Sequence, residues 1–487
     1  MTDLTRVAQL SLWPDGHGPA KKPEKIRDLH TVWQAPESAP AFVRDCPVAQ
    51  RYLRLLGPLR WPELAERDLR PVWRYPTVPW SSLAAAELIR LNEGHASMGR
   101  LHRYLCEHPS LIWLLGFPLR PVPNHPFGFN AQASLPTARH FTQMLRDLPN
   151  AVLQDLLADS VQLVRAALAA RGAPGVTCVS LDTKHVLAWV KENNPKTYVP
   201  DRFNRAYQPA GDPDCRLGCK RRTNRGAPPT PKRNPVAARG HKRGEFYWGY
   251  ASGIVVTKIA DHGEFVLAEL TQPFDQGDVT YFFPLLRQVE DRLGYRPRFA
   301  TFDAAFDAWY VYAYFYRTND PAGGFAAVPF SEKGGYKQTG RRFSPEGLPV
   351  CAAGLAMPLA FTYTNRTRCL VVRERGKYVC PLRFPQPTAR DCPVQHANWQ
   401  RGGCTAMMPT SIGARLRYTL DQDSDQYKQL YRERTAVERI NAQALALGIE
   451  HPHLRNRAAI ANHNTLLYVL INLRFLERLH ERQPLLP

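Results

Sequence analysis

Two aspartates occupy positions where a carboxylate needs a compensating partner. Asp182 lies within VSLDTKHV, an apolar run that predicts a strand, and Asp303 ends RFATFD, which predicts a shorter strand. A carboxylate in such a strand is costly unless a cation or hydrogen bonds compensate for it. Two such carboxylates on one side of a sheet can converge on Mg²⁺, which favours carboxylate and water ligands. For each residue the alternative is a turn or cap former, and Asp307 competes with Asp303 as the second ligand.

A third acid lies in a stretch that predicts one continuous helix from Asp425 to Gly448. Tyr431, Arg434 and Glu438 are spaced i, i+3 and i+7, so they share one face of that helix. An arginine can bind a phosphate through two hydrogen bonds, and a tyrosine can donate one. The alternative is an ordinary charged helix face with i, i+4 ion pairs.

The basic residues are concentrated in two segments. The net charge is +21, from 64 Lys and Arg against 43 Asp and Glu, which predicts a polyanionic partner, nucleic acid before membrane. Residues 215–243 hold ten Lys and Arg and no acid, and residues 331–415 hold 13 against 4, so the two account for nearly all of the excess. The first segment predicts a mobile basic loop that contacts phosphates, and the alternative is a solvated surface. We take as its candidate DNA contacts Lys220, Arg221, Arg222, Lys242 and Arg243.

Helical patterns precede the strands. Ser81 and Ser82 can cap a helix through 84–108, and two further helices are expected over 137–148 and from Asn150 to Gly172. Three helices joined by loops suit a small DNA-binding bundle, and the alternative is a helical cap on the core.

The order of elements after residue 174 is three strands, a helix, a strand, a helix and a strand, with a hairpin around Asp261–Gly263. This order predicts an α/β fold consistent with an RNase H-like mixed-sheet core. Five segments are expected: an irregular N-terminal arm (1–80), a helical DNA-binding region (81–173), the first part of the core (174–330), a β-rich basic insertion (331–415) and C-terminal helices that complete the core (416–487).

The order Asp182, Asp303, Tyr431-x2-Arg434-x3-Glu438 resembles the DDE transposases of bacterial insertion sequences. It is most similar to the group with a β-rich insertion between the second Asp and the Glu. The resemblance covers residues 85–480, and the Tyr/Arg/Glu helix is its most specific part.

The resemblance implies an enzyme that binds the ends of an insertion sequence and catalyses metal-dependent strand cleavage and strand transfer. Asp182, Asp303 and Glu438 would be both catalytic residues and ligands of Mg²⁺, for which Mn²⁺ can substitute, while Tyr431 and Arg434 would hold DNA. The implied partners are double-stranded DNA, as transposon ends and target, and a second copy of the chain in a synaptic homodimer. The implied location is the bacterial cytoplasm, with the nucleoid.

One position departs from the family signature, which continues as Glu-x6-Lys. Leu445 stands at the Lys position, and Arg439 or Arg455 could substitute for it. This departure leaves two alternatives open: a domesticated or decayed DNA-binding protein without catalysis, and a structure-specific nuclease on an RNase H-like core.

Trp399 and the cysteines carry weaker signals. Trp399 is the only tryptophan of the insertion and could stack on a flipped base, as an aromatic residue does in this family; the alternative is a hydrophobic anchor. Cys380, Cys392 and Cys404 recur every twelve residues without a Cys-x2-Cys pair, so we expect reduced thiols rather than zinc ligands. No apolar run is long enough to span a membrane, and the N-terminus does not resemble a signal peptide.

Overall fold

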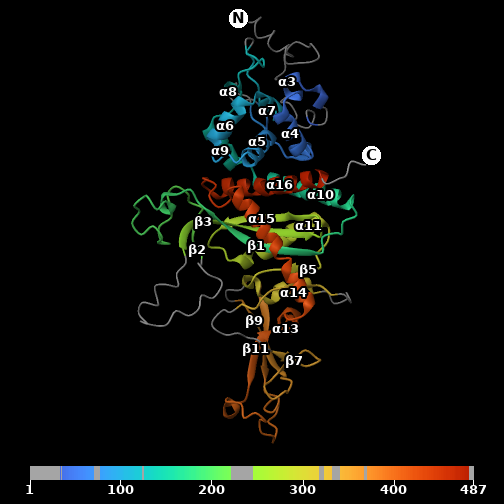
Figure 1. Ribbon diagram of the computed structural model, residues 1–487. Helices are drawn as coiled ribbons and strands as arrows, with labels where there is room; N and C mark the ends of the chain where they lie inside the picture. Colours follow the sequence, from blue (N-terminus) through green and yellow to red (C-terminus); the bar gives the residue numbers. More distant parts are fainter. Residues whose placement is uncertain are drawn as a thin grey trace, which may run out of the picture. The chain divides into compact units, whose positions relative to one another are not determined.

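The structure is a computed structural model that describes the chain from residue 33 to residue 481, with gaps (Figure 1). The described residues are 33, 36–70, 77–122, 125–220, 245–316, 323–331, 341–366 and 370–481. They divide into two compact units. Unit 1 comprises residues up to 175, 183–277 and 438 onwards, and unit 2 comprises 176–182 and 278–437. Strand β1 and helix α15 each run from one unit into the other.

Unit 1 combines the N-terminal helices with an antiparallel set of strands and the last helix. Its helices are α3 (Ala41–Arg44), α4 (Pro47–Leu56), α5 (Trp80–Asn92), α6 (Met98–Glu107), α7 (Pro109–Leu114), α8 (Ala131–Ser134), α9 (Ala138–Asp147), α10 (Asn150–Ala169), most of α15 (Thr435–Ala446) and α16 (Arg457–Glu481). Short 3-10 turns are η1 (Pro36–Ser38), η2 (Trp61–Glu63) and η3 (Lys191–Asn193). Its strands are the second half of β1 (Cys178–Leu187), β2 (Arg216–Lys220), β3 (Glu245–Ile259) and β4 (Gly263–Pro273).

Unit 2 contains the start of β1, two short parallel strands and the β-rich insertion. Its helices are α11 (Phe282–Leu293), α12 (Trp309–Phe315), α13 (Ile412–Thr419) and α14 (Asp425–Arg432), with 3-10 turns η5 (Asp278–Tyr281), η6 (Ala304–Phe306) and η8 (Trp399–Arg401). Its strands are β5 (Phe299–Thr301), β6 (Phe325–Ala327), β7 (Arg342–Phe343), β8 (Pro349–Val350), β9 (Leu359–Asn365), β10 (Arg373–Val379) and β11 (Thr405–Pro409).

The main sheet is mixed and has six strands in the order β2-β3-β1-β5-β6, with β4 paired to β3. Strand β3 pairs with β2 and β4 in antiparallel fashion, and β5 pairs with β1 and β6 in parallel fashion. The β3–β4 turn places Asp261 and Gly263 at positive φ, 63° and 125°, where an aspartate or glycine is tolerated best. The chain therefore has an α/β fold with the hairpin where the sequence places it.

The predicted helix over 84–108 is two helices. Helix α5 ends at Asn92, Gly94 adopts φ 67°, and Ser97 then caps α6 by accepting a hydrogen bond from the Arg100 amide. The expected Ser81 cap is also replaced: the Glu66 carboxylate accepts bonds from the amides of Trp80 and Ser81, at 2.6 and 2.8 Å. The preceding helix α4 buries an apolar face, so this part of the arm is packed rather than irregular.

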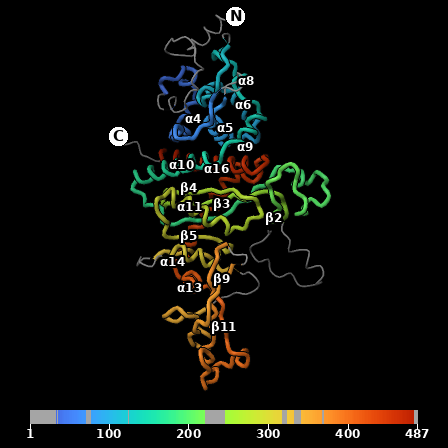
Figure 2. Tube along the Cα trace, turned by 180° about the vertical axis from the view of Figure 1, so that it is seen from behind, coloured from blue at the N-terminus to red at the C-terminus, as the bar shows by residue number. Residues whose placement is uncertain are grey.

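Helix α16 is the centre of unit 1. It packs along α10, α9, α5 and strand β4, as both views show (Figures 1 and 2). Buried polar side chains fix its position: Asn462 donates to the carbonyls of Leu145 and Leu148, at 2.7 and 2.6 Å, and Asn472 donates to the Val266 carbonyl, at 2.9 Å. The N-terminal helices and the strands are thereby joined through one helix.

The insertion in unit 2 is a three-stranded antiparallel sheet in the order β11-β10-β9, and β7 and β8 form a separate pair. Its core is small and consists of Met357, Tyr378, Met408 and Ala414 with a few half-buried neighbours. Helix α13 anchors this region to α12. Gly413 makes that contact possible, since a Cβ atom there would lie 1.9 Å from the Trp309 carbonyl oxygen.

Candidate active site

Asp182 lies within strand β1, and Asp303 lies two residues beyond the end of the neighbouring strand β5. Strands β1 and β5 are parallel, with Ser180 opposite Thr301. Asp182 comes two residues after Ser180, and Asp303 comes two residues after Thr301. The backbone of Asp303 is still extended, with φ −80° and ψ 174°. Because side chains alternate along a strand, each aspartate projects from the same face as the Ser180 or Thr301 before it. The two hydroxyls meet on that face at 2.7 Å.

The turn between α14 and α15 begins on that same face. The Ser180 hydroxyl donates a hydrogen bond to the Glu433 carbonyl, at 3.2 Å. Arg434 follows Glu433 directly and is half-buried. Within unit 2, the face of the sheet that carries the two aspartates is thus the face on which the Tyr431–Arg434 segment is anchored.

The predicted continuous helix is interrupted in this segment. Helix α14 ends at Arg432 and α15 begins at Thr435. The Glu433 and Arg434 amides bond three residues back, to Leu430 and Tyr431, instead of four. The Thr435 hydroxyl also bonds the Arg432 carbonyl, so a side chain satisfies a backbone group that a regular helix would use. The prediction of one continuous helix was therefore wrong, and Tyr431, Arg434 and Glu438 do not share the face of a single helix.

Tyr431 belongs to a column of rings on α14. Its ring is stacked on Tyr427 at a centroid distance of 6.1 Å, and Tyr427 is stacked on Phe325 of β6 at 6.5 Å. Burial raises the pKa of the Tyr427 phenol, with the neighbouring Tyr431 and Asp307 acting in the same direction. The column ties α14 to the edge of the sheet and sets the position of the turn that follows.

Glu438 is exposed and lies in the first turn of α15, where unit 1 resumes. A carboxylate in the first turn is favoured by the helix dipole. Among the described residues there is no group of three or more His, Cys, Asp or Glu side chains arranged to hold a metal ion. The oxygen donors of Asp182 and Asp303 nevertheless match the ligand preference of Mg²⁺.

The two competing aspartates, Asp303 and Asp307, have different environments. Asp303 is half-buried, and its Oδ1 caps η6 by accepting from the Ala305 amide at 2.9 Å, so a cation could be bound through the other oxygen. Asp307 is an internal anchor with its side chain 1% exposed. It binds the Arg417 guanidinium through both oxygens and accepts from the Tyr312 hydroxyl, at 3.0 Å, and the Ser331 amide, at 2.8 Å. Asp307 is therefore engaged in structure.

Comparisons with known proteins give no family. No protein-family model matches the chain, and neither does any curated protein. In the part of the chain that the structure describes, no helix is long and apolar enough to cross a membrane.

Of the candidate DNA contacts in the basic segment, only Lys220 lies among the described residues. It ends strand β2, opposite Glu245 of β3. Residues 216–220 thus form a paired strand, which corrects the expectation of a loop beginning at 215, because the ladder to β3 orders them. Arg221, Arg222, Lys242 and Arg243 lie outside the described residues.

Trp399 and three cysteines lie in the insertion. The Arg383 guanidinium covers the Trp399 ring at 4.0 Å from its centroid, so one face of the ring is already occupied. Cys404 neighbours Cys380 and also Cys351, which the sequence did not single out. Burial and these two thiols raise the pKa of Cys404 to about 12. A thiol with so high a pKa stays protonated, and therefore unreactive, at neutral pH.

Proposed function

We propose that this chain is a DNA transposase of the DDE type with an RNase H-like core. The observation that carries the proposal is that Asp182 and Asp303 each follow, by two residues, the paired Ser180 and Thr301 of parallel strands, on the face where the Ser180–Glu433 bond anchors the segment of Tyr431 and Arg434. The net charge of +21 supports a nucleic-acid partner independently of these residues.

The strand order supports the proposed core. An antiparallel hairpin, β3–β4, extends the sheet on one side of β1, and the parallel strands β5 and β6 extend it on the other. Helix α11 precedes β5 and helix α12 precedes β6. This is the order expected of an RNase H-like fold, with β2 added next to β3 and the β-rich insertion placed between β6 and α14.

In the proposed mechanism, Asp182, Asp303 and Glu438 supply carboxylate oxygens for Mg²⁺ or Mn²⁺. Glu438 is proposed from its sequence distance of four residues to Arg434. The bound metal would activate the attacking water or 3′-hydroxyl and stabilise the leaving oxygen of the phosphodiester. Arg434 would bind a phosphate next to the scissile bond through two hydrogen bonds, and Tyr431 would hold the adjacent backbone. We further propose a homodimer that joins two DNA ends and acts in the cytoplasm at the nucleoid.

The test is cleavage of DNA that contains the sequences flanking this coding region, with Mg²⁺ and, separately, Mn²⁺. We expect Asp182→Asn and Asp303→Asn to bind that DNA as the unaltered chain does but to cut it at least about a hundredfold more slowly, because each substitution removes an anionic ligand. Asp275→Asn is the matched control, since Asp275 is an exposed aspartate outside the site.

The products distinguish the alternatives. Equal cleavage by all three variants would refute the assignment of the two aspartates. DNA binding without cleavage by the unaltered chain would favour a decayed, non-catalytic protein, and cleavage without strand joining would favour a nuclease.

A further inference from the structure

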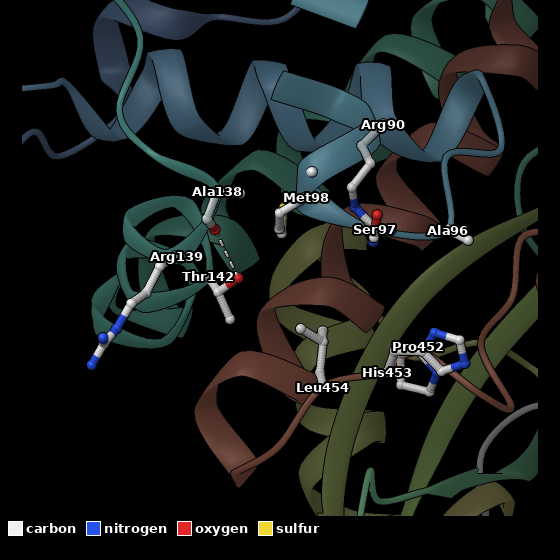
Figure 3. A pocket seen from close by; sticks show the side chains of 11 residues that line it. Arg90, Ala96, Ser97, Met98, Ala138, Arg139, Thr142, Pro452, His453 and Leu454 are labelled. Carbon is white, nitrogen blue, oxygen red and sulfur yellow. Dashed lines mark hydrogen bonds between the residues drawn. The ribbon is translucent and has the colours of Figure 1, made fainter. Parts of the chain in front are cut away.

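A groove of unit 1 has the composition of a site for a nucleic-acid strand. It consists of two adjoining hollows of about 310 and 700 Å³ that share Arg139 and Thr142 of α9 and His453 and Leu454 of the loop before α16. Figure 3 shows the smaller hollow, with Arg139 and Thr142 on one side and His453 and Leu454 on the other. We refer to the two hollows together as the α9 groove.

The lining of the α9 groove is positive. It includes Arg90, Arg139, Arg146 and Arg455 and contains no Asp or Glu. Arg90 is buried against Glu87, which leaves three exposed arginines on the groove. Arg139 and Arg146 are two turns apart on the exposed face of α9, where Arg146 also pairs with Asp147 at 3.4 Å, and Arg455 lines the larger hollow from the loop. Arginines on both sides of an elongated groove suit successive phosphates of a strand better than a single small anion.

An exposed indole lines the larger hollow together with these three arginines. Trp189 is 52% exposed, although large aromatic side chains are usually covered in an isolated protein. Its ring is 4.3 Å from the His453 ring, centroid to centroid, and Arg455 donates to its backbone carbonyl at 2.9 Å. An aromatic ring beside arginines is the arrangement on which unpaired bases stack.

The loop that carries His453 and Arg455 is held in a fixed shape. His453 and Asn456 have positive φ, 54° and 70°, which costs energy for residues other than glycine. The Trp189 amide bonds the Leu454 carbonyl at 3.0 Å, and the fully buried Asp212 accepts from the Asn456 amide at 2.8 Å. A preformed groove binds without the cost of ordering a loop.

We infer that the α9 groove binds a DNA strand, with phosphates on Arg139, Arg146 and Arg455 and an unpaired base on Trp189. The choice of DNA over RNA rests on the proposed function. The arginines and the aromatic ring themselves call only for a phosphate backbone with an exposed base.

The test is the binding of fluorescein-labelled dT20 and of a paired 20-base-pair duplex, by anisotropy, in EDTA so that no cleavage occurs. We expect the double variant R139Q/R455Q to bind dT20 about tenfold more weakly at low salt, because two phosphate contacts are lost. R54Q/R103Q is the matched control: it removes the same charge from exposed arginines of α4 and α6 that do not line the groove, and should bind nearly as the unaltered chain does.

The aromatic contact has its own readout. W189A should weaken dT20 binding about tenfold and duplex binding much less, whereas W189F, which keeps a ring, should retain most of the affinity. Equal losses in R139Q/R455Q and R54Q/R103Q would overturn the inference. Full competition by millimolar inorganic phosphate, without an effect of W189A, would also overturn it and indicate a simple anion site. Vesicles of phosphatidylcholine and phosphatidylglycerol are the third probe. If R139Q/R455Q lost binding to these vesicles but not to dT20, the inference would likewise be overturned.

Failure of the groove and failure of the proposed function give different results. D182N should bind dT20 normally. If D182N cuts DNA as the unaltered chain does, the proposed active site is wrong, but a loss of dT20 binding in R139Q/R455Q and W189A would still support the α9 groove.

Discussion

At the scale of single residues, the surroundings of a carboxylate distinguish a structural role from the proposed catalytic one. Asp303 and Asp307 are four residues apart, and the sequence leaves both as candidates. Asp307 is enclosed by a guanidinium, a hydroxyl and an amide, whereas Asp303 is half-buried and caps a short turn. Removing the Asp307 carboxylate should therefore mainly lower stability, whereas removing the Asp303 carboxylate should mainly lower DNA cleavage.

Asp307→Asn should lower the free energy of unfolding by about 3 kcal/mol, because it leaves the Arg417 guanidinium buried without its counter-charge. Asp303→Asn should cost no more than about 1 kcal/mol, the usual value of a helix-type cap. Urea denaturation of both variants measures the difference. A loss of stability in Asp303→Asn as large as that in Asp307→Asn would assign Asp303 to structure instead of to the proposed metal site.

Leu445 is a second residue with a specific prediction. It is 48% exposed on α15, at the position where the transposase signature that the sequence resembles has Lys, so packing does not require an apolar side chain there. Leu445→Lys should bind DNA several-fold more tightly at low salt and increase the slope of log K against log salt by about 1, because one phosphate contact is gained. Leu445→Gln is the uncharged control. If both variants bind alike, this position does not face the DNA.

At the scale of elements, helix α16 depends on buried ionic and polar contacts as well as apolar packing. Its His463 contacts Glu87 of α5, which is also bound to Arg90 at 2.6 Å. Its Thr465 donates to Glu269 of β4 at 2.8 Å. Burial raises the pKa of the Glu87 carboxyl, but the charges and hydrogen bonds of Arg90 and His463 outweigh it and lower that pKa to about 2. For Glu269, burial prevails and its pKa is raised.

The two glutamates should affect stability with opposite dependence on pH. Glu87 has a lowered pKa, so its contribution of about 3 kcal/mol is present above pH 4.5 and is lost as pH falls from 4.5 towards 2. Glu87→Gln should therefore destabilise the chain at pH 7 and flatten the acid limb of the stability curve. Glu269 has a raised pKa, so its contribution is present below pH 4.5 and is lost as pH rises through the raised value.

Glu269→Gln is therefore the control for which the opposite change in stability at pH 7 is expected. It should leave stability at pH 7 unchanged or increased, because the amide carries no charge to bury. Thermal unfolding between pH 3 and pH 8 compares the two variants. Equal destabilisation of both at pH 7 would contradict the assigned charge states.

At the scale of the whole molecule, charge is the property that most constrains the partner. The basic excess is concentrated in residues 215–243 and 331–415, most of the former outside the described residues. We expect the affinity for duplex DNA to fall steeply with salt, by a slope of about 0.9 for each phosphate contacted.

The basic segment 215–243 should account for part of that salt dependence. R221Q/R222Q should reduce the slope of log K against log salt by about 1 to 2, while R54Q/R103Q, with the same change in charge, should leave it nearly unchanged. Anisotropy titrations from 50 to about 200 mM salt provide the measurement. Equal slopes for the two variants would mean that only net charge matters and that the segment makes no specific contact.

The sequence by itself determined what depends on neighbouring residues. Runs of β-branched and apolar residues predicted the strands, the turn residues predicted the β3–β4 hairpin, and a carboxylate within an apolar strand singled out Asp182. Charge counting located the basic segments. These features are local because backbone periodicity, turn chemistry and the cost of burying a charge act over a few residues.

Only the tertiary structure decided the features that depend on distant contacts. Arg417 binds Asp307, 110 residues away in the sequence, and Asp182 and Asp303 each follow a residue of the β1–β5 pairing, Ser180 and Thr301. The break between α14 and α15 and the α9 groove were missed, although the alternation in HPHLRNR exposes His453 and Arg455 in a way the sequence could have suggested. Such contacts form between segments whose pairing is set by the packing of the whole core, which no local pattern encodes.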